Sequence, residues 1–309
     1  MRWQTQSEFW QGRRVFLTGH TGFKGSWLAH WLLLLGAEVR GFALTPERRQ
    51  VPEGFQPLFE ELALSARLDH IVGNIRDEET LNGSLRAFNP EIVLHLAAQP
   101  LVRASYQNPV ETFATNVLGT AHLLNACRSL PGLRSIVVVS SDKCYENREQ
   151  IWAYRETDPM GGHDPYSSSK GCTELVTNAF RASYFPLEHA DDHGVSISSA
   201  RAGNVIGGGD WSEDRLIPDA MRSMLAGSPL EIRNPRAVRP WQHVLEPLQG
   251  YLTLAQKGAT DPGLVSKGWN FGPATEEALS VGELVSCLES KMRGKFSWKT
   301  GADNGPHEA

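Results

Sequence analysis

The feature that most constrains the fold is a glycine-rich stretch near the N-terminus, Val15 to Gly25. It begins as an apolar run typical of a buried strand and continues into an apolar helical run, Ser26 to Leu35, with Gly19 and Gly22 at the turn between them. Cβ atoms at this turn would crowd an approaching pyrophosphate, whereas the free N–H groups of the helix start attract its charge. The stretch therefore predicts a dinucleotide-binding unit. Its glycine spacing departs by one residue from G-x-G-x-x-G, so the prediction needs support from later residues.

Apolar runs and helical patterns alternate over the first 200 residues. Strands are expected at 38–44, 68–72, 92–96, 136–139 and 195–200, and helices at about 78–88, 109–129 and 165–180. This alternation predicts an α/β fold of the Rossmann type, with a doubly wound parallel sheet. After residue 200 the alternation of strand and helix patterns becomes less regular, although helical patterns recur at 245–256 and 281–292. We therefore expect a dinucleotide-binding domain at 1–200 and a smaller, mainly substrate-binding portion at 201–309.

The charge balance restricts the partners. The 309 residues include 30 basic and 35 acidic ones, a net charge of −5, which argues against nucleic acid or an anionic membrane as the main partner. The longest apolar run, Trp27 to Leu35, is too short to span a bilayer. The four cysteines are scattered without a C-x-x-C pair, which indicates no metal site and suits a reducing cytoplasm.

Small and polar residues follow the predicted strands. Gly73 to Asp77 forms a turn that would lie over an adenine ring, and Ala97-Ala98-Gln99 would let a cofactor lie flat across the strand ends, although simple helix packing explains the alanines equally well. Ser140 to Lys143 follows the strand at 136–139. Because parallel strands end at one edge of the sheet, these clusters should meet in one site.

One expected cofactor contact is missing. An acidic residue that binds the ribose hydroxyls would stand at the end of the second strand, where this chain has Ala43, Leu44 and Thr45. Arg48 and Arg49, just beyond, could bind a 2′-phosphate or belong to a solvated loop. The choice between NAD and NADP stays open on these residues.

Tyr166 and Lys170 stand at i and i+4 on a predicted helix, so they share one face. A lysine ammonium near a phenol favours the phenolate and prepares it to accept a proton. An exposed tyrosine and lysine would be the ordinary explanation of Y-x-x-x-K, but the preceding glycine turn and parallel strands favour the chemical one.

Arginines gather in the C-terminal portion, and their planar forks suit a diphosphate. They are Arg215, Arg222, Arg233, Arg236 and Arg239. A local basic cluster in a net-acidic chain indicates an anionic ligand.

Together these motifs resemble the extended short-chain dehydrogenase/reductase family over nearly the whole chain. The resemblance rests on Thr18-Gly-x-x-Gly-Phe-x-Gly25, His95-Leu-Ala-Ala98, Asn116, Ser140-Ser141, Tyr166-x-x-x-Lys170 and Arg201-x-x-Asn204. Ser141-Asp142-Lys143 is similar to nucleotide-sugar 4,6-dehydratases, and its lysine, with Gly208-Gly-Asp-Trp211, is similar to those that act on CDP-glucose.

The resemblance implies NAD as cofactor and assigns three groups of residues. The catalytic group is Ser141, Asp142, Lys143, Tyr166 and Lys170. The cofactor-binding group is Gly19, His20, Thr21, Gly22, Phe23, Lys24, Gly25, Asn74, Ile75, Leu96, Ala97, Ala98, Gln99, Asn116, Ser140, Tyr166 and Lys170. The substrate-binding group is Asn204, Arg215, Leu216, Pro218, Arg233, Arg239 and Trp241.

The mechanism implied by the resemblance has three steps. Tyr166, assisted by Lys170 and Ser141, removes the proton of the sugar 4-hydroxyl while NAD takes the hydride from C4. Lys143 removes the C5 proton, and a protonated Asp142 helps the 6-hydroxyl leave as water. A lysine with its usual pKa of about 10.4 is charged at neutral pH. The alternative is therefore that Lys143 only stabilises the enolate. Hydride then returns to C6.

The sequence is also compatible with two other functions. A nucleotide-sugar 4-epimerase would use Tyr166 but needs neither Asp142 nor Lys143, and a non-catalytic NAD(P)-binding regulator would need no tyrosine and lysine pair. The resemblance also implies a homodimer formed through the helices at about 109–129 and 165–180, which the apolar positions there permit. It further implies that a final strand or helix is missing beyond Gly305 to Ala309, where this chain stops sooner than the family usually does.

Overall fold

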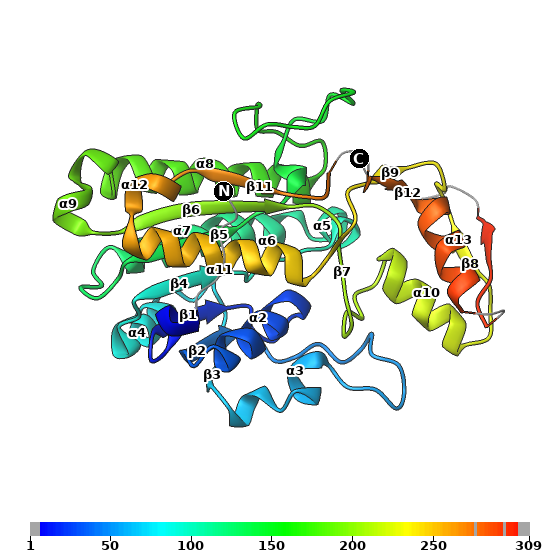
Figure 1. The fold of residues 1–309 in the computed structure, drawn as a ribbon, viewed down its shortest axis with the longest axis horizontal. Coiled ribbons are helices and arrows are strands. Elements are labelled where there is room, and N and C mark those ends of the chain that lie inside the picture. The colour runs from blue at the N-terminus through cyan, green and yellow to red at the C-terminus, as the bar shows by residue number, and fades with distance from the viewer. Residues whose placement is uncertain (1–6, 275–276, 293–294, 302–309) are drawn as a thin grey trace.

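A seven-stranded parallel sheet with the order β11-β6-β5-β4-β1-β2-β3 forms the centre of the chain in the computed structural model, which describes residues 7–274, 277–292 and 295–301 (Figure 1). Its strands are β1 (Arg14–Thr18), β2 (Glu38–Ala43), β3 (Asp69–Val72), β4 (Ile92–His95), β5 (Ser135–Val139), β6 (Ser196–Ala202) and β11 (Gly268–Phe271). Strand order reverses between β1 and β4, which is the point where doubly wound sheets bind ligands. The predicted Rossmann-type α/β fold is confirmed.

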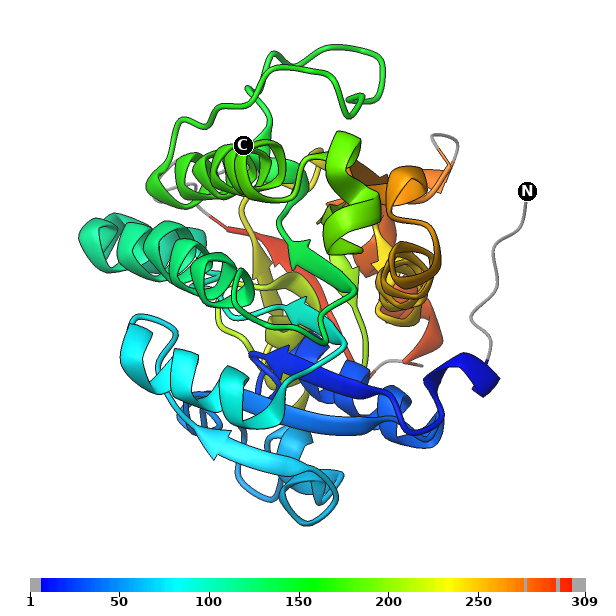
Figure 2. The same ribbon diagram turned by 90° about the vertical axis from the view of Figure 1, so that its left-hand side faces the viewer.

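Helices cover both faces of the sheet (Figure 2). One face carries α4 (Glu78–Phe88), α7 (Gly119–Cys127) and α8 (Pro165–Tyr184), packed over a core that includes Phe16 and Ile136. The other face carries α2 (Phe23–Leu34) and α11 (Leu245–Thr260), packed over a core that includes Leu17 and Val137. Because both faces are covered, β4 and β5 are buried throughout, as their continuous apolar sequences predict.

Short elements connect this framework. They are α1 (Ser7–Trp10), α3 (Leu58–Glu61), η1 (Leu64–Ala66), α5 (Val102–Gln107), α6 (Pro109–Phe113), η3 (Asp142–Cys144), η4 (Leu187–His189), α9 (Ala190–His193) and α12 (Pro262–Val265). Asp77 caps α4 as predicted, since its side chain accepts a hydrogen bond from the Thr80 N–H.

A second, smaller core lies beyond the carboxyl edge of the sheet, at the right of Figure 1. It includes Leu230, Ile232 and Val285. The elements on this side are β7 (Val205–Ile206), α10 (Leu216–Leu225), β8 (Leu230–Ile232), β9 (Val238–Arg239), β10 (Gln242–His243), β12 (Leu279–Ser280), α13 (Val281–Lys291) and β13 (Trp298–Thr300). The expectation of a missing element after Gly305 lies outside the described residues.

Two details differ from the sequence-based expectations. The helix expected at 109–129 is interrupted by a π-helical segment, η2 (Ala114–Leu118), within which the Asn116 carbonyl accepts hydrogen bonds from the Thr120 and Thr173 hydroxyls. The edge strand β11 was not predicted, because its sequence Gly-Trp-Asn-Phe is half-buried and lacks a continuous apolar run. No helix within the described part of the chain is long and apolar enough to cross a membrane.

Candidate active site

The glycine turn forms a cradle at the start of α2. Gly19 has φ +75°, and a Cβ there would lie 2.7 Å from the Ala97 nitrogen. A Cβ on Gly25 would overlap the Gly19 carbonyl oxygen, whereas one on Gly22 would meet nothing closer than that oxygen at 3.5 Å. Gly22 precedes α2 without a side-chain cap, so the first N–H groups of the helix stay available to an anion. This cradle fits the diphosphate of a dinucleotide.

The edge beside this cradle is held rigid by Asn116 from the π-helical segment. Its side-chain oxygen accepts from the Gln99 N–H at 2.8 Å, and its amide nitrogen donates to the Gln99 carbonyl at 3.1 Å and to Ser169 Oγ at 2.8 Å. The predicted cofactor residue Asn116 therefore fixes the 96–99 segment, and its amide is already satisfied. Ser140 Oγ, at the end of β5, is buried without a hydrogen-bond partner among the described residues, so it is free to bind a ligand.

Other predicted cofactor residues lie around the turn and shape its walls. His20 is fully buried, with its Nε2 2.7 Å from His70 Nδ1, and burial lowers its pKa to about 3, so it is neutral. Thr21 donates its hydroxyl to the Leu44 carbonyl at 2.9 Å. Ile75 packs beneath α7, where it would meet a Cβ on Gly119. These side chains already contact other protein groups. We therefore expect these residues to contact a cofactor through their backbone atoms or through the outer surface of the side chain.

The predicted catalytic residues converge at the end of β5. Ser141 Oγ donates to Asp142 Oδ1 at 3.0 Å, and the Lys143 N–H donates to Ser141 Oγ at 3.2 Å. Tyr166 and Lys170 enter from α8, and Lys170 Nζ lies 3.4 Å from the Val139 carbonyl. The 3₁₀ turn η3 and the N-terminal part of α8 thus bring both groups to one edge of the sheet.

Burial sets the protonation of these groups. It raises the pKa of the Asp142 carboxyl against the opposing effects of Ser141 and Lys143, which suits a group that donates a proton. It also raises the pKa of the Tyr166 phenol, although a hydrogen bond with Ser141 and the charge of Arg215 act in the opposite direction. Lys170 has its pKa lowered to about 8 by burial, against the raising effect of Glu174. In the protein without a cofactor, burial is therefore the largest influence on the pKa of the Tyr166 phenol, and Lys170 is not.

Lys24 reaches from the glycine turn into the same space. Burial, Arg215 and Lys170 lower its pKa to about 7, while Asp142 and Asp210 oppose them. The neutral amine is therefore favoured more in Lys24 than in an exposed lysine.

A cavity of about 360 Å³ opens over these groups and extends to the C-terminal portion. It is lined by Lys24, Ser140, Ser141, Asp142, Lys143 and Tyr166, and by all the predicted substrate residues, Asn204, Arg215, Leu216, Pro218, Arg233, Arg239 and Trp241. Of the predicted catalytic residues, Lys170 does not line this cavity; it follows Tyr166 by one turn of α8.

The sequence-based assignment omitted several residues that line the cavity. Asp210 is buried and 3.5 Å from Arg215 Nη1, and Arg103 on α5 forms an ion pair with Asp214 at 2.9 Å across the opening. Asp210 lies within the Gly208-Gly-Asp-Trp211 motif and could have been found there, whereas nothing in the sequence links Arg103 with Asp214.

The chain matches the family model of GDP-mannose 4,6-dehydratase over residues 16–305. It is 52% identical to a CDP-glucose 4,6-dehydratase of Salmonella typhimurium, with the match covering 97% of this chain and 82% of the relative.

Solved structures show the same architecture. A dTDP-glucose 4,6-dehydratase from Streptomyces venezuelae, solved with NAD bound, is 25% identical and superposes with a TM-score of 0.76 over 94% of this chain and 85% of its own. MoeE5 in complex with UDP-glucose and NAD is 28% identical, with a TM-score of 0.72 over 94% of this chain and 89% of its own.

Proposed function

This chain belongs to the GDP-mannose 4,6-dehydratase family, and from its 52% identity to a CDP-glucose 4,6-dehydratase we propose that it is an enzyme of that kind. It converts CDP-D-glucose to CDP-4-keto-6-deoxy-D-glucose by oxidation at C4, loss of water across C5 and C6, and reduction at C6. The main observation in support of this proposal is that Tyr166 and the Asp142-Lys143 pair line one cavity. Oxidation of the sugar needs a proton acceptor such as Tyr166, and elimination of water needs an acid and a base, which Asp142 and Lys143 provide.

We assign the proton transfers to the groups that line the cavity. Tyr166 takes the proton of the 4-hydroxyl, with Ser141 hydrogen-bonded to its phenol and Lys170 one helical turn behind it. Asp142, whose carboxyl pKa is raised by burial, gives its proton to the departing 6-hydroxyl oxygen. Lys143, the next residue, faces the same cavity and, as the neutral amine, removes the C5 proton. A ketone at C4 makes this proton acidic enough to be removed.

NAD is the cofactor that the glycine cradle and the family support, and when bound it supplies the acceptor for the C4 hydride and the donor that returns it to C6. The residues that hold it are those of the cradle, Gly19 to Gly25, and the 96–99 segment that Asn116 fixes. The unpartnered hydroxyl of Ser140 is available beside them.

The substrate side of the cavity suits a nucleoside diphosphate. Arg215, Arg233 and Arg239 approach it from three different segments, so they can surround a diphosphate. Trp241 adds an aromatic surface, which is held by a hydrogen bond from its Nε1 to the Leu279 carbonyl at 3.0 Å.

Purified protein incubated with CDP-glucose deuterated at C4 tests the function. We expect a 4-keto-6-deoxy sugar that carries the deuterium in its methyl group. A C4 epimer of the starting sugar would instead identify the protein as a nucleotide-sugar 4-epimerase. Binding of NAD without any change in the sugar would identify it as a regulator and contradict the proposal.

We also propose a homodimer and a cytoplasmic location. The exposed side chains of Val110, Leu118 and Leu175, which are 81%, 55% and 60% accessible, lie on α6, the π-helical segment and α8. These three segments pack against one another, and we infer that the three side chains belong to one apolar surface that a second copy of the chain covers. The scattered cysteines suit a reducing compartment.

A further inference from the structure

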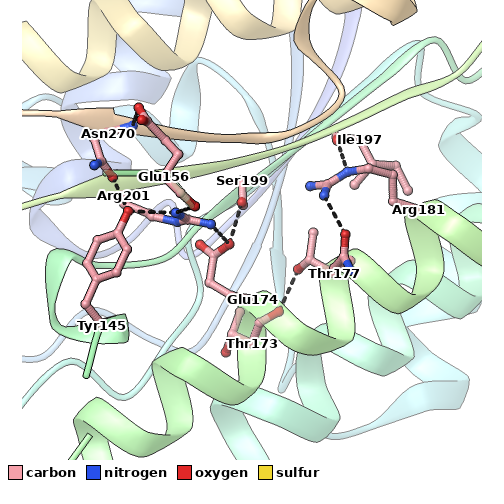
Figure 3. Close-up of polar contacts among 11 residues, drawn as sticks. Tyr145, Glu156, Thr173, Glu174, Thr177, Arg181, Ile197, Ser199, Arg201 and Asn270 are labelled. Carbon is pink, nitrogen blue, oxygen red and sulfur yellow. Dashed lines mark hydrogen bonds and ion pairs between the residues drawn. The ribbon is translucent and has the colours of Figure 1, made fainter. Parts of the chain in front are cut away.

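A buried ion pair lies beneath the candidate active site, away from the cavity. Glu174 on α8 and Arg201 on β6 join through Oε2 and Nη2 at 2.8 Å, with side chains only 5% and 6% accessible (Figure 3). Ser199 Oγ donates to the same carboxylate oxygen at 2.6 Å. Desolvating two charges is costly, and apolar residues of similar volume often stabilise a fold as well, so such a pair suggests a purpose other than stability.

The position of Glu174 along α8 connects the pair to the proton-transfer groups. Tyr166, Lys170 and Glu174 follow one another at intervals of four residues, so all three lie along one face of the helix. A second contact further along, from Arg181 Nε to the Ile197 carbonyl at 2.8 Å, fixes the helix on the same strand (Figure 3). Both contacts join α8 to β6, and the first lies on the helix face that carries Tyr166.

The other side of the Arg201 guanidinium reaches the segment that follows the acid and base. Its Nη1 donates to Tyr145 Oη at 2.7 Å and to the Glu156 carbonyl at 3.0 Å. The Tyr145 hydroxyl donates in turn to Asn270 Oδ1 on β11 at 2.7 Å. Tyr145 comes directly after η3, which carries Asp142 and Lys143. One guanidinium therefore contacts both the helix of Tyr166 and the end of the Asp142-Lys143 turn.

We propose, on the basis of the proposed dehydratase function, that Glu174 and Arg201 are positioning residues that hold the oxidation group, Tyr166 and Lys170, in register with the elimination group, Asp142 and Lys143. Neither lines the cavity, so they act through the residues that do. Glu174 has a further effect, because its negative charge raises the pKa of Lys170 against burial and so favours the charged form of the lysine, one helical turn from Tyr166.

The charged groups around Lys170 make the influence of Glu174 on the lysine pKa measurable. Glu174 and Cys144 raise the pKa of Lys170 against burial, and the lysine charge in turn acts on Lys24 from α2 and on His95 from β4. Of these two residues, Glu174 raises the pKa of Lys170 more. Removal of its charge should therefore lower the pKa of Lys170 below about 8, so that the lysine loses its proton at a lower pH.

Glu174→Gln tests this role, because it keeps the shape and the oxygen that accepts from Ser199 but removes the charge. We expect the alkaline limb of the kcat/KM profile to move to lower pH by about one unit, with an unchanged Kd for CDP-glucose. Glu91→Gln is the control, because Glu91 also pairs with an arginine, Arg13, but in a more exposed position at the opposite edge of the sheet. Its profile should match that of the unaltered protein.

Failure of this inference can be distinguished from failure of the proposed function. If the unaltered protein makes no 4-keto-6-deoxy sugar, the function is wrong. If it does, and Glu174→Gln leaves the profile unmoved, the positioning role is wrong.

Tyr145→Phe provides a second test should Glu174→Gln fail to fold. It removes only the hydroxyl that connects Arg201 to Asn270 and buries no unpaired charge. In a single turnover in D₂O, we expect deuterium entry at C5 to slow about tenfold, with C4 oxidation slowed far less. Equal slowing of both steps, or of neither, would overturn the connection.

Discussion

At the scale of single residues, burial decides what the polar groups of the site can do. The Asp142 carboxyl and the Tyr166 phenol both have raised pKa values because burial disfavours their charged forms, whereas the same burial lowers the pKa of Lys24 to about 7 and of Lys170 to about 8. The identity of these residues could be predicted from motifs. Their ionisation could not, because it depends on neighbours that are distant in sequence, such as Arg215 and Asp210.

The glycines of the turn make different contributions that two substitutions separate. Gly22→Ala should leave the free energy of unfolding nearly unchanged, since its Cβ has room, yet weaken NAD binding by occupying space beside the diphosphate. Gly25→Ala should destabilise the fold by about 1–3 kcal/mol, because its Cβ overlaps the Gly19 carbonyl. Thermal unfolding and NAD titration measure the two effects. Equal destabilisation by both substitutions would contradict the distinction.

At the scale of elements, the ends of strands bring together what the sequence separates. The turn after β1 and the segment after β4 meet directly, since Gly19 has no room for a Cβ beside Ala97. The strands themselves were predictable from apolar runs. The short elements of the C-terminal portion were not, because β9 and β12 contain two residues each and are defined only by their pairing.

The β9 and β12 pair places Arg239 on the cavity wall, which leads to a prediction. Arg239→Ala should raise the KM for CDP-glucose about tenfold to a hundredfold, as expected for a lost hydrogen bond to a charged group, and leave NAD affinity unchanged. Steady-state kinetics and NAD titration would measure both. Arg236→Ala is the control, because Arg236 is exposed and does not line the cavity. An unchanged KM in Arg239→Ala would remove this residue from the binding site.

At the scale of the whole molecule, the C-terminal portion and the sheet make the cavity together. Arg103 from the helix after β4 pairs with Asp214 from the segment before α10, and both residues line the cavity. The chain beyond residue 201 contributes both to this cavity wall and to the sheet layers, through α11 and β11.

The apolar surface on α6 and α8 gives a prediction at this scale. Val110→Glu combined with Leu175→Glu should convert a dimer into a monomer, because a charge would be buried without a partner at each site. Light scattering coupled to size-exclusion chromatography measures the mass. Leu225→Glu is the control, since Leu225 is 50% accessible on α10, away from this surface. A monomeric unaltered protein would refute the dimer.

The sequence alone determined the α/β class and the glycine turn, placed Tyr166 and Lys170 on one helix face, and identified three arginines that line the cavity, Arg215, Arg233 and Arg239. These depend on local periodicity and on residue types with few physical alternatives. Only the tertiary structure decided that Asn116 is used to fix a neighbouring segment, and that Arg201 joins Glu174 to Tyr145 across β6. Such contacts connect residues between 17 and 56 positions apart, and no pattern along the chain encodes which distant side chains will meet.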